Sequence, residues 1–158
     1  MSHVVIVGAG PAGASLAGLL AHRGIEVTLL ERRRDFAREF RGEVLMPSGI
    51  EALEQMGVVS LLQTIPTHTQ RAISLYMNGR TILKLNLEED AFDGRLPMAV
   101  SQPALLEALV AHAQRSSHFR FMRGVSVKDL LMQNSRVSGT QDAAIYFLLT
   151  RPGMNRCS

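Results

Sequence analysis

The stretch VVIVGAGPAGASLAGLLAHRGIEVTLLERR runs from Val4 to Arg33 and decides the fold. Its first 18 residues carry no charge, which is close to the length of about 20 apolar residues that a membrane-spanning helix needs. Residues that disfavour a helix interrupt this run at Gly8, Gly10, Pro11 and Gly13. A signal peptide would carry positive charge before the run, where the chain has Ser2 and His3. We therefore expect neither a membrane span nor an export signal.

Divided at the glycines, the stretch predicts a strand, a helix and a second strand. His3–Val7 is a short β-branched run typical of a buried strand. A helix is expected over Pro11–Arg23, with an apolar side formed by Leu16, Leu19 and Leu20. Gly24 would end this helix because glycine adopts a positive φ easily, and a strand is expected over Glu26–Leu30.

The spacing Gly8-x-Gly10-x-x-Gly13 falls between the first strand and the helix. Such a loop presents free backbone N–H groups and the positive end of the helix dipole to a pyrophosphate. Glu31 ends the second strand, where a carboxylate accepts hydrogen bonds from a ribose 2′-OH. The pattern predicts a dinucleotide-binding βαβ unit. By itself it does not separate NAD from FAD, and glycines that only shape a turn are the alternative.

The composition argues against several other classes of protein. The 17 Lys and Arg against 14 Asp and Glu give a net charge of only +3, and the densest basic run, residues 32–41, contains two acids, so no nucleic-acid partner is expected. The only cysteine, Cys157, excludes an intrachain disulfide and suggests a reducing, cytoplasmic location. His112 and His118 have no metal-ligand spacing, so no metal site is expected.

The rest of the chain continues the alternation of helices and strands. MPSGIEALEQMG predicts a helix with Ser48 as N-cap and Glu51 completing a capping box. Residues 71–87 predict a hairpin with a type I′ turn at Asn78-Gly79. Ser101 is expected to cap a helix with an apolar face at Leu105, Leu106, Leu109 and Ala113. FRFMRGVSVKDLL then predicts a third parallel strand, a turn at Gly124 and a further strand.

Three separated segments carry a resemblance to a known family: GAGPAGASLAGLLAHRGIEVTLLERR, EFRGEVLMPSGIEALEQMGV and AVSQPALLEALVAHA. In this order, over approximately residues 3–130, the chain resembles the FAD-dependent aromatic hydroxylases, which are para-hydroxybenzoate hydroxylase-like flavoprotein monooxygenases. The resemblance implies a Rossmann-like α/β fold with a parallel sheet and an inserted hairpin. It also implies FAD as cofactor, NAD(P)H as transient electron donor and an aromatic or polycyclic small molecule as substrate. It assigns no catalytic residue to this chain.

The same resemblance implies roles for single residues at the adenosine half of FAD. The pyrophosphate would be held by Gly8, Gly10, Pro11, Ala12 and Gly13. Glu31 would contact the adenosine ribose, with Arg32 near the adenine and Val127 beside it.

Two further residues matched by the family lie outside the first motif. Arg41 would reach the phosphate or ribityl region, where a guanidinium suits a pair of phosphate oxygens. Gln102 would hydrogen-bond the ribityl-phosphate portion through its neutral amide. Without the resemblance, Arg41 also reads as a solvated surface charge and Gln102 as an ordinary first-turn helix residue.

From about Arg136 the pattern departs from the family, whose later Asp-Gly and Gly-Asp segments have no match here. The apolar run 143–150 is expected to form a substitute edge strand. We therefore expect the front part of such an enzyme: a discontinuous FAD-binding domain at 1–70 and 98–135, an inserted hairpin at 71–97 that begins a substrate-covering sheet, and an atypical tail at 136–158. The alternatives are a truncated, non-catalytic FAD or adenine-dinucleotide binder whose sheet a partner chain completes, and an NAD-dependent dehydrogenase domain.

Overall fold

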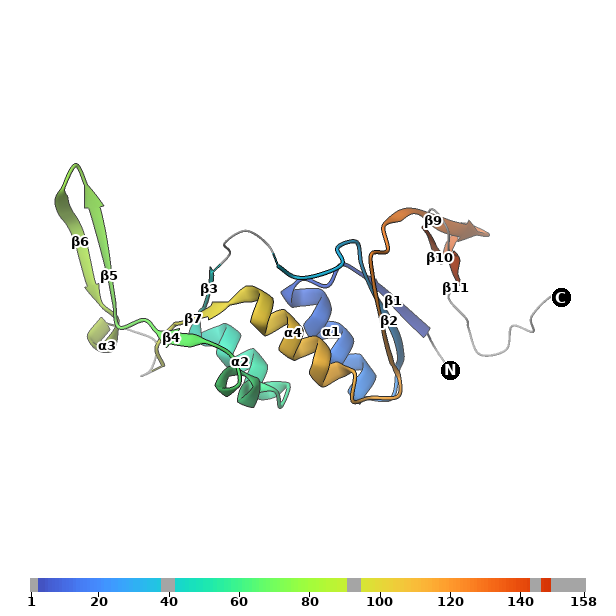
Figure 1. Ribbon diagram of the computed structural model, residues 1–158, viewed down its shortest axis with the longest axis horizontal. Helices are drawn as coiled ribbons and strands as arrows, with labels where there is room; N and C mark the ends of the chain where they lie inside the picture. The colour runs from blue at the N-terminus through green and yellow to red at the C-terminus, as the bar shows by residue number, and fades with distance from the viewer. Residues whose placement is uncertain (1–2, 38–41, 91–94, 143–145, 149–158) are drawn as a thin grey trace. The chain divides into compact units, whose positions relative to one another are not determined.

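The computed structural model describes residues 3–37, 42–90, 95–142 and 146–148 (Figure 1). Contacts within the chain define two compact units, Met1–Ala37 together with Leu106–Ser158, and Arg38–Leu105. Helix α4 (Gln102–Ala113) begins in the second unit and continues into the first. The functional division at 1–70 with 98–135, 71–97 and 136–158 stays a prediction.

The first unit contains the predicted βαβ arrangement. Strand β1 (His3–Val7), helix α1 (Pro11–His22) and strand β2 (Glu26–Glu31) follow one another, and β8 (Phe119–Arg123) joins the sheet. All pairings are parallel and the order is β1-β2-β8. Gly24 has a φ of 78° directly after α1, as expected of a residue that ends a helix. The predicted parallel α/β fold is confirmed.

An antiparallel sheet follows the parallel one in the same unit. It consists of β9 (Val127–Gln133), β10 (Arg136–Asp142) and β11 (Tyr146–Leu148) in the order β11-β10-β9. The turn at Gly124, with a φ of 75°, leads into it as predicted. Strand β11 lies inside the apolar run 143–150 and is an edge strand of this sheet.

Helix α1 packs through small side chains, which differs from the sequence-based expectation. Its buried residues are Ala14, Ala17, Gly18 and Ala21, whereas Leu16 is 47% exposed. Leu19 and Leu20 are half-buried, so the leucine side is not the most buried face of the helix. These small residues bring the helix close to its neighbours: a Cβ on Gly18 would lie in ordinary contact, 3.5 Å from the Cβ of Ala113 in α4.

The predicted apolar face of α4 is confirmed, since Leu105, Leu106, Leu109 and Ala113 are all buried. Its last turn lies beside the last turn of α1 (Figure 1). There the rings of His22 and His112 stack with centroids 4.6 Å apart, and the His22 side chain bonds the carbonyl oxygen of Gly18. Burial, and secondly the charge of His22, lower the pKa of His112.

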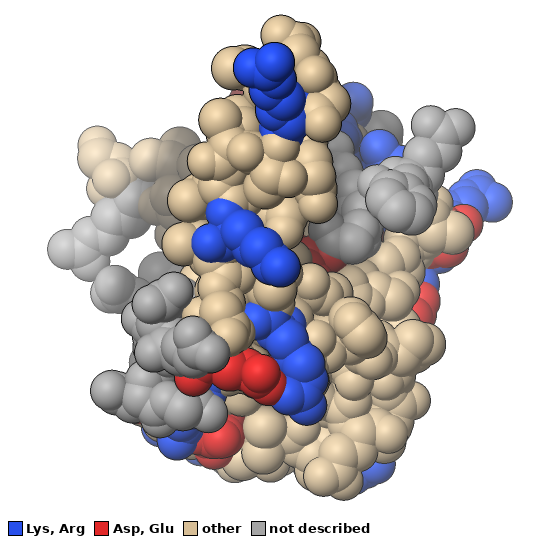
Figure 2. All heavy atoms as spheres, turned by 90° about the vertical axis from the view of Figure 1, so that its left-hand side faces the viewer, with Lys and Arg blue, Asp and Glu red and all other residues tan. Residues whose placement is uncertain are grey.

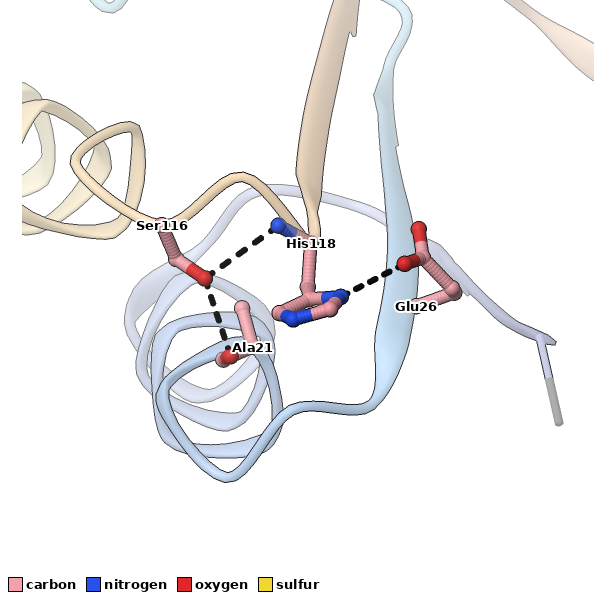
Figure 3. A network of polar contacts seen from close by, with 4 residues as sticks. All are labelled: Ala21, Glu26, Ser116 and His118. Carbon is pink, nitrogen blue, oxygen red and sulfur yellow. Dashed lines mark hydrogen bonds and ion pairs between the residues drawn. The ribbon is translucent and has the colours of Figure 1, made fainter. Parts of the chain in front are cut away.

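A polar network connects the end of α1 with the amino ends of strands β2 and β8 (Figure 3). The Ser116 hydroxyl donates to the carbonyl oxygen of Ala21 at 2.9 Å and accepts from the backbone N–H of His118 at 3.3 Å. The imidazole Nδ1 of His118 lies 2.5 Å from Glu26 Oε1. Since parallel strands bind ligands at their opposite, carboxyl ends, this network holds the end of α1 to the sheet away from the glycine loop.

The second unit is built from short elements. Strands β3 (Gly42–Leu45), β4 (Thr67–Thr69) and β7 (Met98–Ser101) form an antiparallel sheet in the order β3-β7-β4. The helical elements are α2 (Pro47–Gln55), the 3₁₀ helix η1 (Val59–Gln63) and α3 (Leu87–Asp90).

Helix α2 begins two residues earlier than the predicted N-cap at Ser48 implies. Met46 is its N-cap and Pro47 its first residue, so the predicted capping role of Ser48 is wrong. Proline favours this position because its fixed φ is helical and its missing N–H would have no helical partner. Gly57 has a φ of 71° just after the helix, as expected of its end.

The predicted hairpin is confirmed as β5 (Ala72–Met77) and β6 (Arg80–Asn86), joined by Asn78 and Gly79 with φ of 49° and 75°. The pair Leu75 and Leu83 shares one face and is 54% and 44% exposed. Figure 2 views the molecule from the hairpin side and shows a mostly uncharged surface with separate Lys and Arg side chains. Whether this apolar side forms a substrate wall stays a prediction.

Candidate functional site

The glycine loop between β1 and α1 is tied to the carboxyl end of β2. The backbone N–H of Gly8 donates to the carbonyl oxygen of Leu30 at 2.7 Å, and that of Ala9 donates to Glu31 Oε2 at 2.9 Å. Gly8 has a φ of 98°, a conformation that residues with a Cβ rarely adopt. These two bonds fix the loop before any ligand is present.

Gly13 brings α1 against this loop. A Cβ on Gly13 would lie 2.0 Å from the carbonyl oxygen of Gly8 and 3.5 Å from the Ile6 side chain. A side chain larger than hydrogen therefore does not fit, because the nearest atom is backbone. This close approach aims the start of α1 at the space beyond the loop.

The first turn of α1 presents free donors to that space. Among the residues that the structure describes, the N–H groups of Gly10, Ala12 and Gly13 have no hydrogen-bond partner. Gly10 is the N-cap, the first turn contains no acid, and a Cβ on Gly10 would meet no atom within 4 Å. Unpartnered amides at a helix N-terminus, beside a glycine whose Cβ position is open, suit a phosphate, so the residues fit the pyrophosphate of FAD.

Glu31 holds the other side of this site. Glu31 is only 5% exposed. Besides the bond from Ala9, its carboxylate accepts a hydrogen bond from the backbone N–H of Arg33 through Oε1, at 3.0 Å. The carboxylate thus connects the glycine loop to the segment that follows β2. The predicted contact between Glu31 and a ribose agrees with its position at the strand end, and the contact itself stays a prediction.

The segment after β2 continues alongside the turn after β8. Val125 N–H donates to the carbonyl oxygen of Glu31 at 3.0 Å, and Gly124 N–H donates to that of Arg33 at 3.2 Å. Arg32 is exposed next to Glu31. Val127, at the start of β9, packs against the buried cluster of Leu30 and Val125. Both residues predicted to lie near the adenine therefore belong to the first unit, and their roles stay predictions.

Sequence reasoning missed a cluster that anchors the far end of this segment. Phe36 is 2% exposed and stacks on Phe121 of β8 with centroids 6.1 Å apart. The Arg123 guanidinium lies over both rings, 4.7 Å from the centroid of Phe36 and 4.9 Å from that of Phe121. It also donates to both carboxylate oxygens of Glu107 in α4, at 2.9 and 2.6 Å.

This arrangement keeps Arg123 charged and oriented. Its hydrogen bonds to Glu107 raise the pKa of Arg123 further above its ordinary value. A signal for the cluster existed in the alternation of phenylalanine and arginine along FRFMR, but its partners Phe36 and Glu107 are distant in sequence.

The remaining predicted residues lie in the second unit. Gln102 donates its amide Nε2–H to Glu43 Oε2 at 2.6 Å, a contact between the start of α4 and β3. Its predicted bond to the ribityl-phosphate portion stays a prediction. Arg41 lies outside the described residues.

Within the described part of the chain, no group of three or more His, Cys, Asp or Glu side chains is placed to hold a metal ion. No described helix is both long and apolar enough to cross a membrane.

Comparison with known proteins identifies relatives of this fold and site. The family described as "FAD binding domain" matches residues 1–143. The 6-methylpretetramide 4-monooxygenase of Streptomyces rimosus is 31% identical over 136 residues, which are 86% of this chain and 32% of that protein. Squalene epoxidase 4 of Arabidopsis thaliana is 31% identical over 140 residues, which are 86% of this chain and 26% of that protein. The chain therefore spans about a third or less of these curated relatives.

Solved structures share the fold at lower identity. The p-nitrophenol 4-monooxygenase PnpA from Pseudomonas putida DLL-E4 has a TM-score of 0.75 and 21% identity, covering 92% of this chain and 38% of its own. PqsL, a probable FAD-dependent monooxygenase from Pseudomonas aeruginosa, has a TM-score of 0.73 and 19% identity, and the match covers 89% of this chain and 38% of PqsL. The family match selects FAD over NAD, which the glycine spacing alone left open. The chain belongs to the FAD binding domain family and corresponds to the N-terminal FAD-binding region of the para-hydroxybenzoate hydroxylase-like flavoprotein monooxygenases.

Proposed function

We propose that this chain is the FAD-binding portion of an NAD(P)H-dependent flavoprotein monooxygenase that hydroxylates an aromatic or polycyclic small molecule. The observation that carries the proposal is the set of amides at Gly10, Ala12 and Gly13, which have no partner among the described residues, together with the open space at the Cβ position of Gly10. The names of relatives support the reaction class, since two of them are a 6-methylpretetramide 4-monooxygenase and a p-nitrophenol 4-monooxygenase. A cytoplasmic location is part of the same proposal.

The chain's own contribution is binding and orientation. The three amides would donate to the pyrophosphate oxygens of FAD, helped by the positive end of the α1 dipole. The Glu31 carboxylate, already fixed by the amides of Ala9 and Arg33, would accept from the adenosine ribose. When bound, the flavin supplies the electron transfer and oxygen activation of the reaction.

Two measurements test this proposal. The purified chain, incubated with FAD and freed of excess cofactor, should retain visible flavin absorbance. Gly10→Ala should lose it while folding normally, because the new methyl group would meet no protein atom within 4 Å but would keep a phosphate from approaching the backbone at this position. A chain that never retains flavin, or a Gly10→Ala variant that retains it as well as the parent, contradicts the proposal.

A second candidate is an FAD-binding module without catalysis of its own. It is favoured by the coverage, since the chain matches only 32% of the Streptomyces rimosus monooxygenase. The two candidates differ in NAD(P)H oxidation by the flavin-loaded chain in the presence of oxygen. Consumption of NAD(P)H supports the monooxygenase, and a yellow protein without turnover supports the binding module.

A further inference from the structure

The segment Arg32–Asp35 belongs to the proposed adenosine site, where Arg32 is predicted to lie near the adenine. All four residues are exposed, and they lie between Glu31, which holds the glycine loop, and the buried ring of Phe36. An exposed loop loses conformational freedom when it contacts a ligand, which weakens binding unless the loop is already held in place. The position of this segment therefore depends on how firmly its two ends are fixed.

The near end is fixed by hydrogen bonds and the far end by an aromatic and ionic cluster. Arg33 N–H donates to Glu31, and Gly124 N–H donates to the carbonyl oxygen of Arg33. At the far end Arg123 joins Phe36 to α4, because its guanidinium lies over the Phe36 ring and donates to both carboxylate oxygens of Glu107. A guanidinium suits this position because it can stack on a ring and bind a carboxylate with two parallel N–H groups at once.

We propose that Arg123 is a positioning residue for FAD, which holds Arg32–Asp35 through Phe36 in the conformation that receives the adenosine end of the cofactor. This inference rests on the proposed function, because it takes the adenosine half of FAD to lie beside Glu31. It assigns no contact between Arg123 and the cofactor. Its consequence is that Arg123 affects the adenosine end and leaves the pyrophosphate contacts of the glycine loop unchanged.

The experiment compares three ligands on the full chain: FAD, ADP and inorganic pyrophosphate, each titrated by calorimetry or by competition with FAD. Arg123→Gln should weaken FAD and ADP about tenfold, while the affinity for pyrophosphate stays within about twofold of the parent. Binding is measured well below the unfolding midpoint of each variant, so that the folded fraction is the same.

Arg120→Gln is the matched control. Arg120 is on the same strand, is exposed and has no ion-pair partner among the described residues, so its loss changes the net charge equally and should leave all three affinities unchanged. Arg123→Lys keeps the charge but not the two-pronged geometry, and its ADP affinity should lie between those of the parent and Arg123→Gln.

Phe36→Leu provides an independent route, and it replaces Arg123→Gln if that variant does not fold. It should weaken ADP binding in the same direction, and in the double variant with Arg123→Gln the losses should not add, because both changes release the same segment. ADP affinity unchanged in both single variants, or ADP and pyrophosphate weakened by the same factor, overturns the positioning role. If the parent chain binds neither FAD nor ADP, the proposed function itself fails, which is a different outcome from the previous two.

Discussion

Replacing Gly13 by alanine is the sharpest test of how the glycine loop is built. The added Cβ would lie 2.0 Å from the Gly8 carbonyl oxygen, whereas real Cβ contacts are essentially never shorter than 3.0 Å. Helix and loop must therefore separate by at least 1.0 Å, the difference between these two distances. Such a shift would stretch the bond from Gly8 to Leu30 or that from Ala9 to Glu31, which are 2.7 and 2.9 Å long.

The expected change in stability follows from three contributions. Overpacking costs about 1–3 kcal/mol, and one lost hydrogen bond costs about 1 kcal/mol. The better helix propensity of alanine returns about 1 kcal/mol. Gly13→Ala should therefore lower the free energy of unfolding by about 1–3 kcal/mol and should also abolish retention of FAD, because the displaced amides no longer converge on the phosphates.

Urea denaturation followed by circular dichroism measures the first effect, and flavin absorbance after gel filtration measures the second. Gly18→Ala in the same helix is the matched control, since its Cβ would make an ordinary contact of 3.5 Å with Ala113. It should stabilise the chain by about 0.5–1 kcal/mol. The reasoning is refuted if Gly13→Ala is as stable as Gly18→Ala and retains flavin.

Three further predictions concern separate parts of the chain. Glu31→Ala should lower the free energy of unfolding by about 1–3 kcal/mol and weaken FAD binding, because the N–H of Ala9 is left without an acceptor. Denaturation midpoints and flavin titrations equal to those of the parent would contradict this. Because the pKa of His112 is lowered from 6.5 in the fold, the unfolded state binds more protons as the pH falls, so stability should decrease below about pH 6.5. The drop in urea midpoint should be smaller in His112→Asn, and an equal drop would contradict the burial of His112 beside His22 as its cause. Gly79→Ala should destabilise the hairpin by about 1 kcal/mol because its φ is 75°, and unchanged amide exchange in β5 and β6 would oppose this.

The βαβ unit could be predicted from the sequence because its signals are local. Apolar β-branched residues, the glycine spacing and Glu31 each act within a few residues, and together they leave one arrangement of strand, helix and strand. The hairpin was equally accessible, since Asn78 and Gly79 both adopt the positive φ that a type I′ turn requires.

Features that depend on close approach or distant partners could not be predicted. The leucines of α1 are its most hydrophobic residues, whereas the residues that the fold buries are the small Ala14, Ala17, Gly18 and Ala21. The cluster of Arg123 with Phe36 and Glu107 joins three elements that are far apart in sequence. No local pattern distinguishes such an arginine from Arg120 on the same strand, which is exposed and has no ion-pair partner in the described part of the chain.

The glycine motif also combines two requirements that the sequence presents as one. Gly13 is required by the fold, because the atom that excludes a Cβ is the Gly8 carbonyl oxygen. Nothing within 4 Å in the protein excludes a Cβ at Gly10, whose φ of −70° suits any residue. A requirement for glycine at Gly10 must therefore come from a ligand that approaches the backbone. If a phosphate lies against Gly10, both Gly10→Ala and Gly13→Ala should lose flavin, and only Gly13→Ala should lose stability. If both substitutions destabilise the chain, the whole loop is instead a structural turn.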